Sequence, residues 1–137
     1  MIFQTELHIE TPGRGMLCID TQIRDAVSGK LPGCGLLHIF CRHTSASILL
    51  QENADPTARL DLEAFFDRLA PDGQAWHQHT VEGPDDSSAH MKSVVLPSEI
   101  TLPIRDGQLA CGKWQGLFLF EHRHKPHSRC VLLTVYG

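Results

Sequence analysis

The sequence has 137 residues, of which 42% are hydrophobic and 20% charged, and its formal net charge is −4 with histidine neutral. A chain of this length is expected to form one domain, residues 1–137, with a sizeable core. The acidic balance excludes the basic field that attracts nucleic acid, and no apolar run reaches the roughly 18 residues of a membrane span. We therefore expect neither nucleic acid nor a membrane as a partner.

Five cysteines are scattered along the chain, and no Cys-x-x-Cys pair occurs. An odd number of thiols, most of them among apolar or small residues, is typical of buried free cysteines rather than of disulfides or zinc ligands. Residues Met1–Glu6 lack the basic and apolar regions of a signal peptide. Together these features favour a reducing compartment, and we expect a cytoplasmic protein.

The first third of the chain predicts mainly strands. Apolar and polar side chains alternate over residues 2–10, as in a half-buried strand. The turn at residues 12–15 predicts that residues 16–20 return as the hairpin partner of this strand. Residues 35–41 are apolar on both faces except for one histidine, which predicts an interior strand covered on both sides. Residues 48–50 predict a second buried strand.

Helices are predicted from their end signals. Asp55 as N-cap and Pro56 at the first position begin a helix whose apolar stripe continues to residue 69. Thr21 is a candidate cap for a short helix that ends before Gly29. Ser88 is a candidate cap for another short helix over residues 89–96, which would place His90 and Lys92 near a helix start.

The remaining third again predicts strands. Residues 100–104 alternate, with Pro103 indicating an edge, and a hairpin turn of the Asp-Gly kind follows at residues 105–108. Residues 117–120 predict a strand that is apolar on both faces, residues 122–129 a solvated basic loop, and residues 130–136 a last strand. The whole pattern predicts an α+β domain with an antiparallel sheet, one main helix over about 56–69, and short helices.

Residues 79–92 contain two histidines, three acidic residues and a lysine, with almost no large apolar side chain. The Gly83–Pro84 pair breaks any regular element, so the backbone turns there. So many ligand-type groups in one loop predict a site at which four side chains converge: His79, Glu82, Asp86 and His90. A solvated acidic turn is the alternative interpretation.

Three further polar stretches follow apolar segments, where rigid strand ends can position functional groups. They are residues 42–47, residues 51–53, and residues 114–116 together with Glu121. Each has a structural alternative: His43 as a core histidine, Asn53 as part of a turn, and Trp114 as a core residue. Glu121 ends a two-sided apolar strand, where a buried carboxylate needs a cation, a donor or water.

Imidazole and carboxylate groups suit divalent transition metals, although the separation of eleven residues between His79 and His90 is not a zinc-finger spacing. Fewer than four protein ligands would leave the open position that Lewis-acid or hydrolytic chemistry requires. The same residues can instead hold a phosphate, with help from Lys92 and backbone N–H groups at a helix start. The residue types leave both interpretations open.

Four blocks of the sequence resemble the YjbQ family, also called uncharacterised protein family 0047 or the secondary thiamine-phosphate synthase enzymes. In order, the blocks are His43–Ser47, Gln51–Pro56, His79–Lys92, and Gly112–Gly116 with Glu121. The resemblance covers nearly the whole chain. The sequence departs from it at Ser87–Ser88, where Met-Pro is expected, and at Cys111 and Lys113, where Leu and Thr are expected. None of these departures removes a candidate ligand.

The resemblance implies an antiparallel sheet curled into a half-barrel or sandwich, assembled as a homotrimer, with a pocket for a divalent metal ion, zinc or magnesium. It also implies a thiamine-phosphate synthase activity of secondary importance, which joins a pyrimidine-methyl pyrophosphate to a thiazole phosphate. The expected metal ligands are His43, His79 and His90. The expected catalytic residues are Glu82, Asn53, Asp86, Lys92 and Glu121, and the expected cofactor-binding residues are Thr44, Ser45, Trp114 and Gln115.

Within this set we expect Glu82, or Glu121, to be the general base, and Lys92 to offset negative charge on the leaving pyrophosphate. The partner would then be a small phosphorylated metabolite. The alternative function is a non-catalytic trimeric protein that binds a metal or such a metabolite. A third hypothesis is that the polar residues organise a subunit interface.

Overall fold

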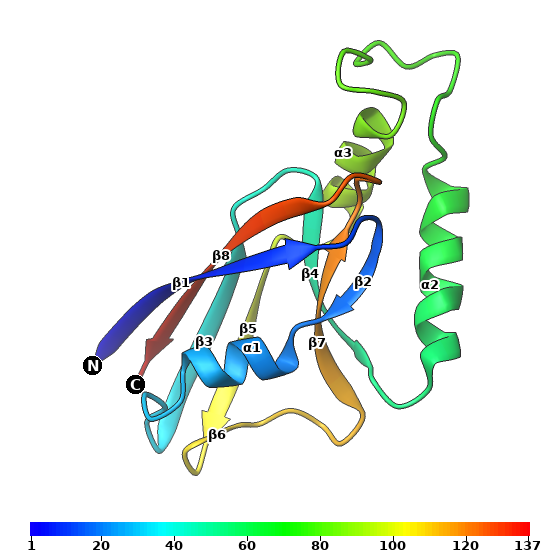
Figure 1. The fold of residues 1–137 in the computed structure, drawn as a ribbon. Coiled ribbons are helices and arrows are strands. Elements are labelled where there is room, and N and C mark those ends of the chain that lie inside the picture. Colours follow the sequence, from blue (N-terminus) through cyan, green and yellow to red (C-terminus); the bar gives the residue numbers. More distant parts are fainter.

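The computed structural model describes residues 1–137 and has two antiparallel sheets and three helices (Figure 1). The strands are β1 Ile2–Thr11, β2 Gly15–Cys18, β3 Cys34–Cys41, β4 Ala46–Glu52, β5 Glu99–Arg105, β6 Gln108–Leu109, β7 Gln115–Glu121 and β8 His127–Tyr136. The helices are α1 Asp20–Ala26, α2 Pro56–Leu69 and α3 Asp86–Val95. The large sheet has the order β1-β8-β3-β5-β6 and the small sheet the order β2-β7-β4. The strands curl into a half-barrel, which confirms the predicted α+β class.

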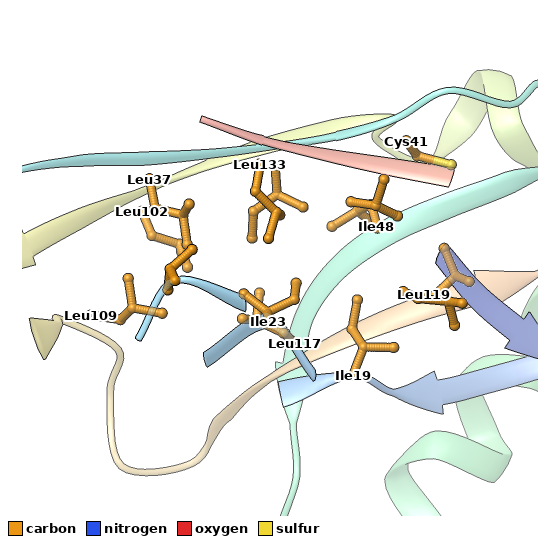
Figure 2. Packing of buried hydrophobic residues seen from close by; sticks show 14 of the residues in the cluster. Ile19, Ile23, Leu37, Cys41, Ile48, Leu102, Leu109, Leu117, Leu119 and Leu133 are labelled. Carbon is orange, nitrogen blue, oxygen red and sulfur yellow. The ribbon is translucent and has the colours of Figure 1, made fainter. Parts of the chain in front are cut away.

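The main hydrophobic core lies between the large sheet, the small sheet and α1. Figure 2 shows Leu37, Leu102 and Leu133 of the large sheet gathered with Ile23 of α1 and Ile48 of the small sheet. Strand β7 contributes to two clusters because its side chains alternate. Leu117 and Leu119 belong to the main core, whereas Phe118 and Phe120 pack with Met16 and Phe66 on the side of α2. The predicted two-sided strand over residues 117–120 is therefore confirmed.

Strand β1 confirms the alternation over residues 2–10, but the predicted hairpin is wrong. Its partner is β8, along a register from Ile2–Tyr136 to Thr11–His127, so the two chain ends lie side by side (Figure 1). Strand β2 instead pairs with β7 in the small sheet. The connecting turn contains Gly13 and Gly15 at φ values of 129° and 145°, a region that favours glycine, and it carries the chain from one sheet to the other.

Strand β3 is present where predicted, but the expectation that both its faces are covered is wrong. Leu37 and Ile39 are fully buried in the main core, whereas Leu36 and Phe40 on the opposite face are 37% and 36% exposed. No helix of this chain covers the outer face of the large sheet (Figure 1). The apolar run therefore reflects one buried face and one face that is apolar at the surface.

Helix α2 has the predicted bounds because local chemistry sets its start: the Asp55 carboxylate accepts from the Thr57 N–H (2.9 Å), and Pro56 occupies the first turn. The other two predicted caps are wrong. Helix α1 begins at Asp20, without a side-chain cap, and helix α3 begins at Asp86 with Asp85 at its N-cap position. None of the three helices combines the length and the apolar character that crossing a membrane requires.

The start of α3 has a direct consequence for the site. Ser88 lies inside the helix, where its hydroxyl donates to the Asp72 carboxylate and to the Asp85 carbonyl. His90 consequently lies one turn after Asp86 instead of at the helix start, and Lys92 lies in the last turn. Side chains four residues apart share one face of a helix, so the fold directs Asp86 and His90 to the same place.

Candidate metal centre

Three ligand-type side chains meet at the start of α3. The Oδ2 atom of Asp86 lies 2.7 Å from Nε2 of His79 and 3.4 Å from Nε2 of His90. All three ligand atoms lie within 4.8 Å of one another, and the two imidazole centroids are 5.2 Å apart. His79 comes from the long loop between α2 and α3. The predicted convergence of these three residues is a feature of the structure.

The two oxygens of the Asp86 carboxylate have different surroundings. Its Oδ1 atom accepts from Nη1 of Arg123 (2.9 Å), whereas its Oδ2 atom is buried and makes no hydrogen bond of regular geometry, with His79 Nε2 as a neighbour at ion-pair distance. Only 2% of Asp86 is exposed, so water cannot readily supply the missing partner. A buried acceptor without a donor carries a desolvation penalty of about 1–3 kcal/mol. The two neighbouring imidazole nitrogens make this oxygen suitable for a cation that all three atoms share.

Arg123 fixes the acidic side of the site. Its Nε atom donates to Asp85 (3.1 Å) and its Nη2 atom to the Glu82 carbonyl (2.8 Å), in addition to the contact with Asp86. Burial alone lowers the pKa of Arg123, but the Asp85 hydrogen bond and charge outweigh burial and raise that pKa. Conversely, burial alone raises the pKa of Asp85, and the His124 N–H and Arg123 hold it below its usual value. Both groups therefore stay charged, and the planar guanidinium positions Asp86.

The orientation of His90 also suits metal binding. Its Nδ1 atom lies 2.9 Å from the Thr44 carbonyl oxygen, and a carbonyl can only accept. In neutral His90 the proton is therefore on Nδ1, and the lone pair is on Nε2, the atom that faces Asp86. Metal-bound histidines commonly donate their second ring nitrogen to a carbonyl in this way. Thr44, expected to bind a cofactor, thus contacts the site through its backbone.

His43 is near this cluster but outside it. Its Nε2 atom accepts the backbone N–H of Cys130 (2.7 Å), so this nitrogen is not free for a metal. Burial and the Arg129 charge lower the pKa of His43 and keep it neutral. With His90, it lines a cavity of about 660 Å³. A second cavity of about 650 Å³ shares Thr44 and His90 with the first and also reaches His79.

Glu121 and Ser45 belong to a separate buried cluster. Glu121 is fully buried, and its carboxylate accepts hydrogen bonds from both Nε and Nη2 of Arg129, from the Thr11 hydroxyl, and from the Arg123 backbone N–H. Arg129 also donates to the Ser45 hydroxyl (2.9 Å). Burial alone raises the pKa of Glu121, but Arg129 and Thr11 outweigh it and hold that pKa below its usual value.. Glu121 therefore has the cation and donors that its burial requires.

Lys92, expected near the reacting phosphate, is 1% exposed, and its Nζ atom donates to Asp67 of α2 (2.7 Å). It thus links α3 to α2. Glu82 differs from the other acidic residues of the loop because its side chain is 67% exposed, with one carboxylate oxygen 3.6 Å from Nη1 of Arg123. Glu82 is consequently the carboxylate near the cluster that remains open to solvent.

Asn53, Trp114 and Gln115 line a different cavity, of about 500 Å³, next to α1 and the β5–β6 hairpin. Local contacts hold this group together. The Asn53 N–H donates to the Trp114 carbonyl (2.9 Å), and the Gln115 side chain accepts from the Gly112 N–H (2.7 Å). None of the three residues lines either cavity beside His90. Within one chain, the predicted site residues are therefore divided among three regions: the cluster on α3, the buried Glu121 cluster, and this cavity.

The solvated basic loop predicted for residues 122–129 is confirmed at His124 and Lys125, which are exposed, but it is wrong at both ends, where sequence reasoning missed important residues. His122 is fully buried, with Nε2 2.9 Å from the Ser47 hydroxyl, and its pKa is lowered to about 3 by burial and by the Lys92 charge. Arg129 is buried and Arg123 is half-buried, and both are held in ion pairs. The sequence could have indicated the burial of Arg129, because in β8 every second residue faces inward and Arg129 lies at one of these positions. Nothing local indicated Arg123, whose partners lie some forty residues earlier.

Comparison with known families supplies the relationship that the four sequence blocks suggested. The model of the family described as "UPF0047 protein YjbQ-like" matches residues 5–137. The chain belongs to this family. Among YjbQ-like relatives, the YjbQ protein of Salmonella typhimurium is 42% identical over 138 residues, covering 100% of this chain and 99% of the relative. A UPF0047 protein of Synechocystis is 41% identical over 134 residues, covering 98% and 91%.

Solved structures agree with the YjbQ-like fold. A conserved hypothetical protein from Thermus thermophilus superimposes with a TM-score of 0.82 at 34% identity, covering 93% of this chain and 97% of the other. A YjbQ/UPF0047 protein from Clostridium acetobutylicum gives a TM-score of 0.86 at 29% identity, covering 96% and 99%. Neither name states a reaction, so a functional argument for this YjbQ-like chain rests on the geometry of its own site.

Proposed function

We propose that His79, Asp86 and His90 hold a divalent transition-metal ion, and that this centre binds a small phosphorylated metabolite. The observation that carries the proposal is the gathering of three ligand atoms: the buried Oδ2 atom of Asp86, which makes no hydrogen bond of regular geometry, faces two imidazole nitrogens. A cation shared by the three atoms would satisfy this oxygen. It would also use the nitrogen of His90 that its contact with Thr44 leaves without a proton.

The donor set favours zinc over magnesium. Imidazole nitrogens suit zinc and other transition metals, whereas magnesium prefers a shell of oxygen atoms. Two histidines and one carboxylate are three protein ligands, which leaves a position for a ligand atom from outside. When bound, such a metal supplies Lewis acidity and a positive charge for phosphate oxygens. His43, included among the expected ligands, stays outside this set because its Nε2 atom is already engaged.

The cavity beside the cluster supports an anionic ligand. Beside Phe40, Cys41 and Val94, its lining includes one cation, two histidines and three hydroxyl side chains: Arg42, His43, Thr44, His90, Ser93 and Ser98. The guanidinium of Arg42 and these hydroxyls match the acceptor oxygens of a phosphate group. His90 borders both this cavity and the cluster, so a phosphorylated molecule in the cavity would lie next to the metal.

For the reaction we propose the synthase type that the family resemblance implies. A pyrimidine-methyl pyrophosphate loses its pyrophosphate as the carbon–oxygen bond breaks, and the nitrogen of a thiazole phosphate forms the new carbon–nitrogen bond. Both substrates are phosphorylated, which is compatible with the cation and hydroxyl side chains that line the cavity. Glu82 is the carboxylate best placed to exchange protons with solvent, because Glu121 is held in its ion pair with Arg129. The five free thiols support a cytoplasmic location.

We also propose the homotrimer. Its support is the outer face of the large sheet, where Leu36, Phe40 and Tyr136 remain exposed and no helix of the chain covers them. Apolar side chains gathered on one exposed face are typical of surfaces that contact another chain. Sedimentation equilibrium tests this part: a mass of three chains is expected, and a monomer would contradict it.

One observation favours the alternative function, binding without catalysis. Lys92, expected to offset charge on a leaving pyrophosphate, is buried and paired with Asp67. Thermal unfolding with zinc and pyrophosphate separates the two functions when it is combined with a synthase assay. Stabilisation by both ligands without product after long incubation supports a binding protein, and product formation supports the enzyme.

The metal proposal is tested with purified protein that carries no histidine tag. Zinc binding is measured by calorimetry for the wild type, Asp86→Asn and His90→Ala, with His38→Ala as the control. His38 is a histidine on the outer face of the large sheet, paired with Glu99. We expect both site variants to lose one zinc ion per chain and the control to keep it. Unchanged zinc binding in both site variants would overturn the proposal.

A further inference from the structure

A second group of ligand-type side chains lies on the outer face of the large sheet, on strands β1 and β8. His8 and Cys130 are direct partners across these strands. Glu6 lies two residues before His8, so its side chain is on the same face. One ligand atom from each of the three lies within 4.8 Å of the other two. None of the three residues lines the cavities beside His90.

We propose that Glu6, His8 and Cys130 form a second metal site, which binds zinc or a similar thiophilic divalent ion. A thiolate, an imidazole and a carboxylate are all established zinc ligands, and a thiolate in particular selects against magnesium and calcium. The Cys130 thiol is free and half-buried, so it is available as a ligand. Binding replaces the S–H bond with a metal–sulfur bond and releases the proton to solvent.

The backbone presents these ligands without a loop rearrangement. β1 and β8 are paired along ten consecutive positions, and the site lies in the middle of this ladder. The Cys130 N–H is tied to Nε2 of His43, which further fixes the backbone at the thiol. A site on paired strands is held more rigidly than one on a loop, and a rigid site loses less entropy when the metal binds.

The two oxygens of the Glu6 carboxylate have different neighbours, because Arg42 pairs with only one of them. Its Nη1 atom lies 3.0 Å from Oε1 of Glu6, while the other oxygen, Oε2, lies 3.6 Å from Nε2 of His8. One carboxylate oxygen is therefore neutralised, and the other faces the imidazole. The positive charge of Arg42 opposes a second cation nearby. We consequently expect reversible binding, weaker than in a closed structural site of four ligands, and tighter binding once Arg42 is replaced.

The site is tested with cobalt, which replaces zinc in such sites and gives a thiolate-to-metal charge-transfer band in the near ultraviolet. Cobalt is titrated into the wild type, Cys130→Ser and Cys34→Ser, with all thiols kept reduced. Cys34 is the matched control, because it is an exposed thiol at the far end of β3. The band is expected in the wild type and in Cys34→Ser, and zinc should displace it. Its absence from the wild type, or its persistence in Cys130→Ser, would refute the proposal.

Two further variants separate this site from the centre on α3. His90→Ala should keep the charge-transfer band even where it has lost the zinc ion at Asp86, because the two sites share no ligand. Arg42→Ala should shift the cobalt titration to lower concentration. A band that disappears in His90→Ala would show that the thiolate does not belong to an independent site.

Discussion

Two buried carboxylates in this molecule have opposite surroundings. Glu121 has donors on both oxygens, from Arg129, Thr11 and a backbone N–H. Asp86 is equally inaccessible, yet only one of its oxygens has a donor, and the other faces two imidazoles. Buried polar groups in native proteins are nearly always hydrogen-bonded, so the difference is informative. The protein alone supplies every partner of Glu121, whereas Oδ2 of Asp86 is the atom at which we propose a bound metal ion.

The largest expected effect is a loss of stability when Glu121, the fully hydrogen-bonded carboxylate, is replaced. Glu121→Ala leaves Arg129 buried without its partner, and breaking such a pair costs about 3–5 kcal/mol of unfolding free energy. Urea unfolding measures this loss. Zinc binding at Asp86 should remain wherever the variant is folded, because Glu121 is linked to that cluster only through the backbone N–H of Arg123, whose side chain keeps its own contacts with Asp85 and Asp86. Loss of zinc binding in a folded Glu121→Ala protein would erase the distinction between the two carboxylates.

The next effect concerns the buried histidine beside Glu121. The pKa of His122 is about 3 in the folded protein, because burial and the Lys92 charge oppose protonation. Unfolded histidine takes up a proton near pH 6.5, so stability is complete above that pH and falls as the pH decreases toward 3. We expect the metal-free protein to lose about 2–3 kcal/mol between pH 6.5 and 4.5 through this group.

Urea unfolding with a chelator at a series of pH values tests this linkage, and His122→Gln should flatten the pH dependence. His43 provides the control because burial also lowers its pKa. His43→Gln should retain most of the slope. Equal slopes for the wild type and His122→Gln would contradict the assignment.

A smaller effect is expected from Arg123, which positions the Asp86 carboxylate. Arg123 bonds Asp85, Asp86 and the Glu82 carbonyl through three different nitrogens, which a lysine cannot reproduce. Residues that orient a metal ligand typically contribute about 10–100-fold in affinity, and we expect Arg123→Lys to weaken zinc binding by this amount. Competition with a chromophoric chelator measures it. Wild-type affinity would mean that Asp86 does not need this support.

The smallest effect is expected at Glu82. Its exposed carboxylate lies 3.6 Å from Arg123, and exposed ion pairs contribute about 0–1 kcal/mol. Glu82→Gln should therefore change zinc affinity by less than about 5-fold, the factor that corresponds to 1 kcal/mol. Synthase turnover should fall if Glu82 is the general base. A much larger loss of zinc would instead place Glu82 among the ligands.

The parts of the fold that follow from neighbouring residues were predictable from the sequence. Helix α2 has its predicted bounds because Asp55 and Pro56 define its start locally. The turn after β5 was also predicted, and Asp106 and Gly107 take the positive φ values of 53° and 76° that an Asp-Gly hairpin turn requires. The partner of β2 was not predictable in this way, because strand pairing joins segments a hundred residues apart.

The candidate site shows the same division. His79, Asp86 and His90 were predicted because they are close in sequence, and the positions of Asp86 and His90 place them on one helical face. Arg123 was missed because its partners lie in another part of the chain. Asn53, Trp114 and Gln115 resemble the same family pattern as the histidines, yet they line a separate cavity. A sequence pattern alone does not say which of its blocks meet in space.

Anomalous X-ray diffraction from crystals grown with zinc tests the central claim most directly. The account predicts a zinc peak between Nε2 of His79, Nε2 of His90 and Oδ2 of Asp86, and its disappearance in Asp86→Asn crystals. If the wild-type crystals show zinc at other positions and none among these three atoms, the account of this centre is wrong.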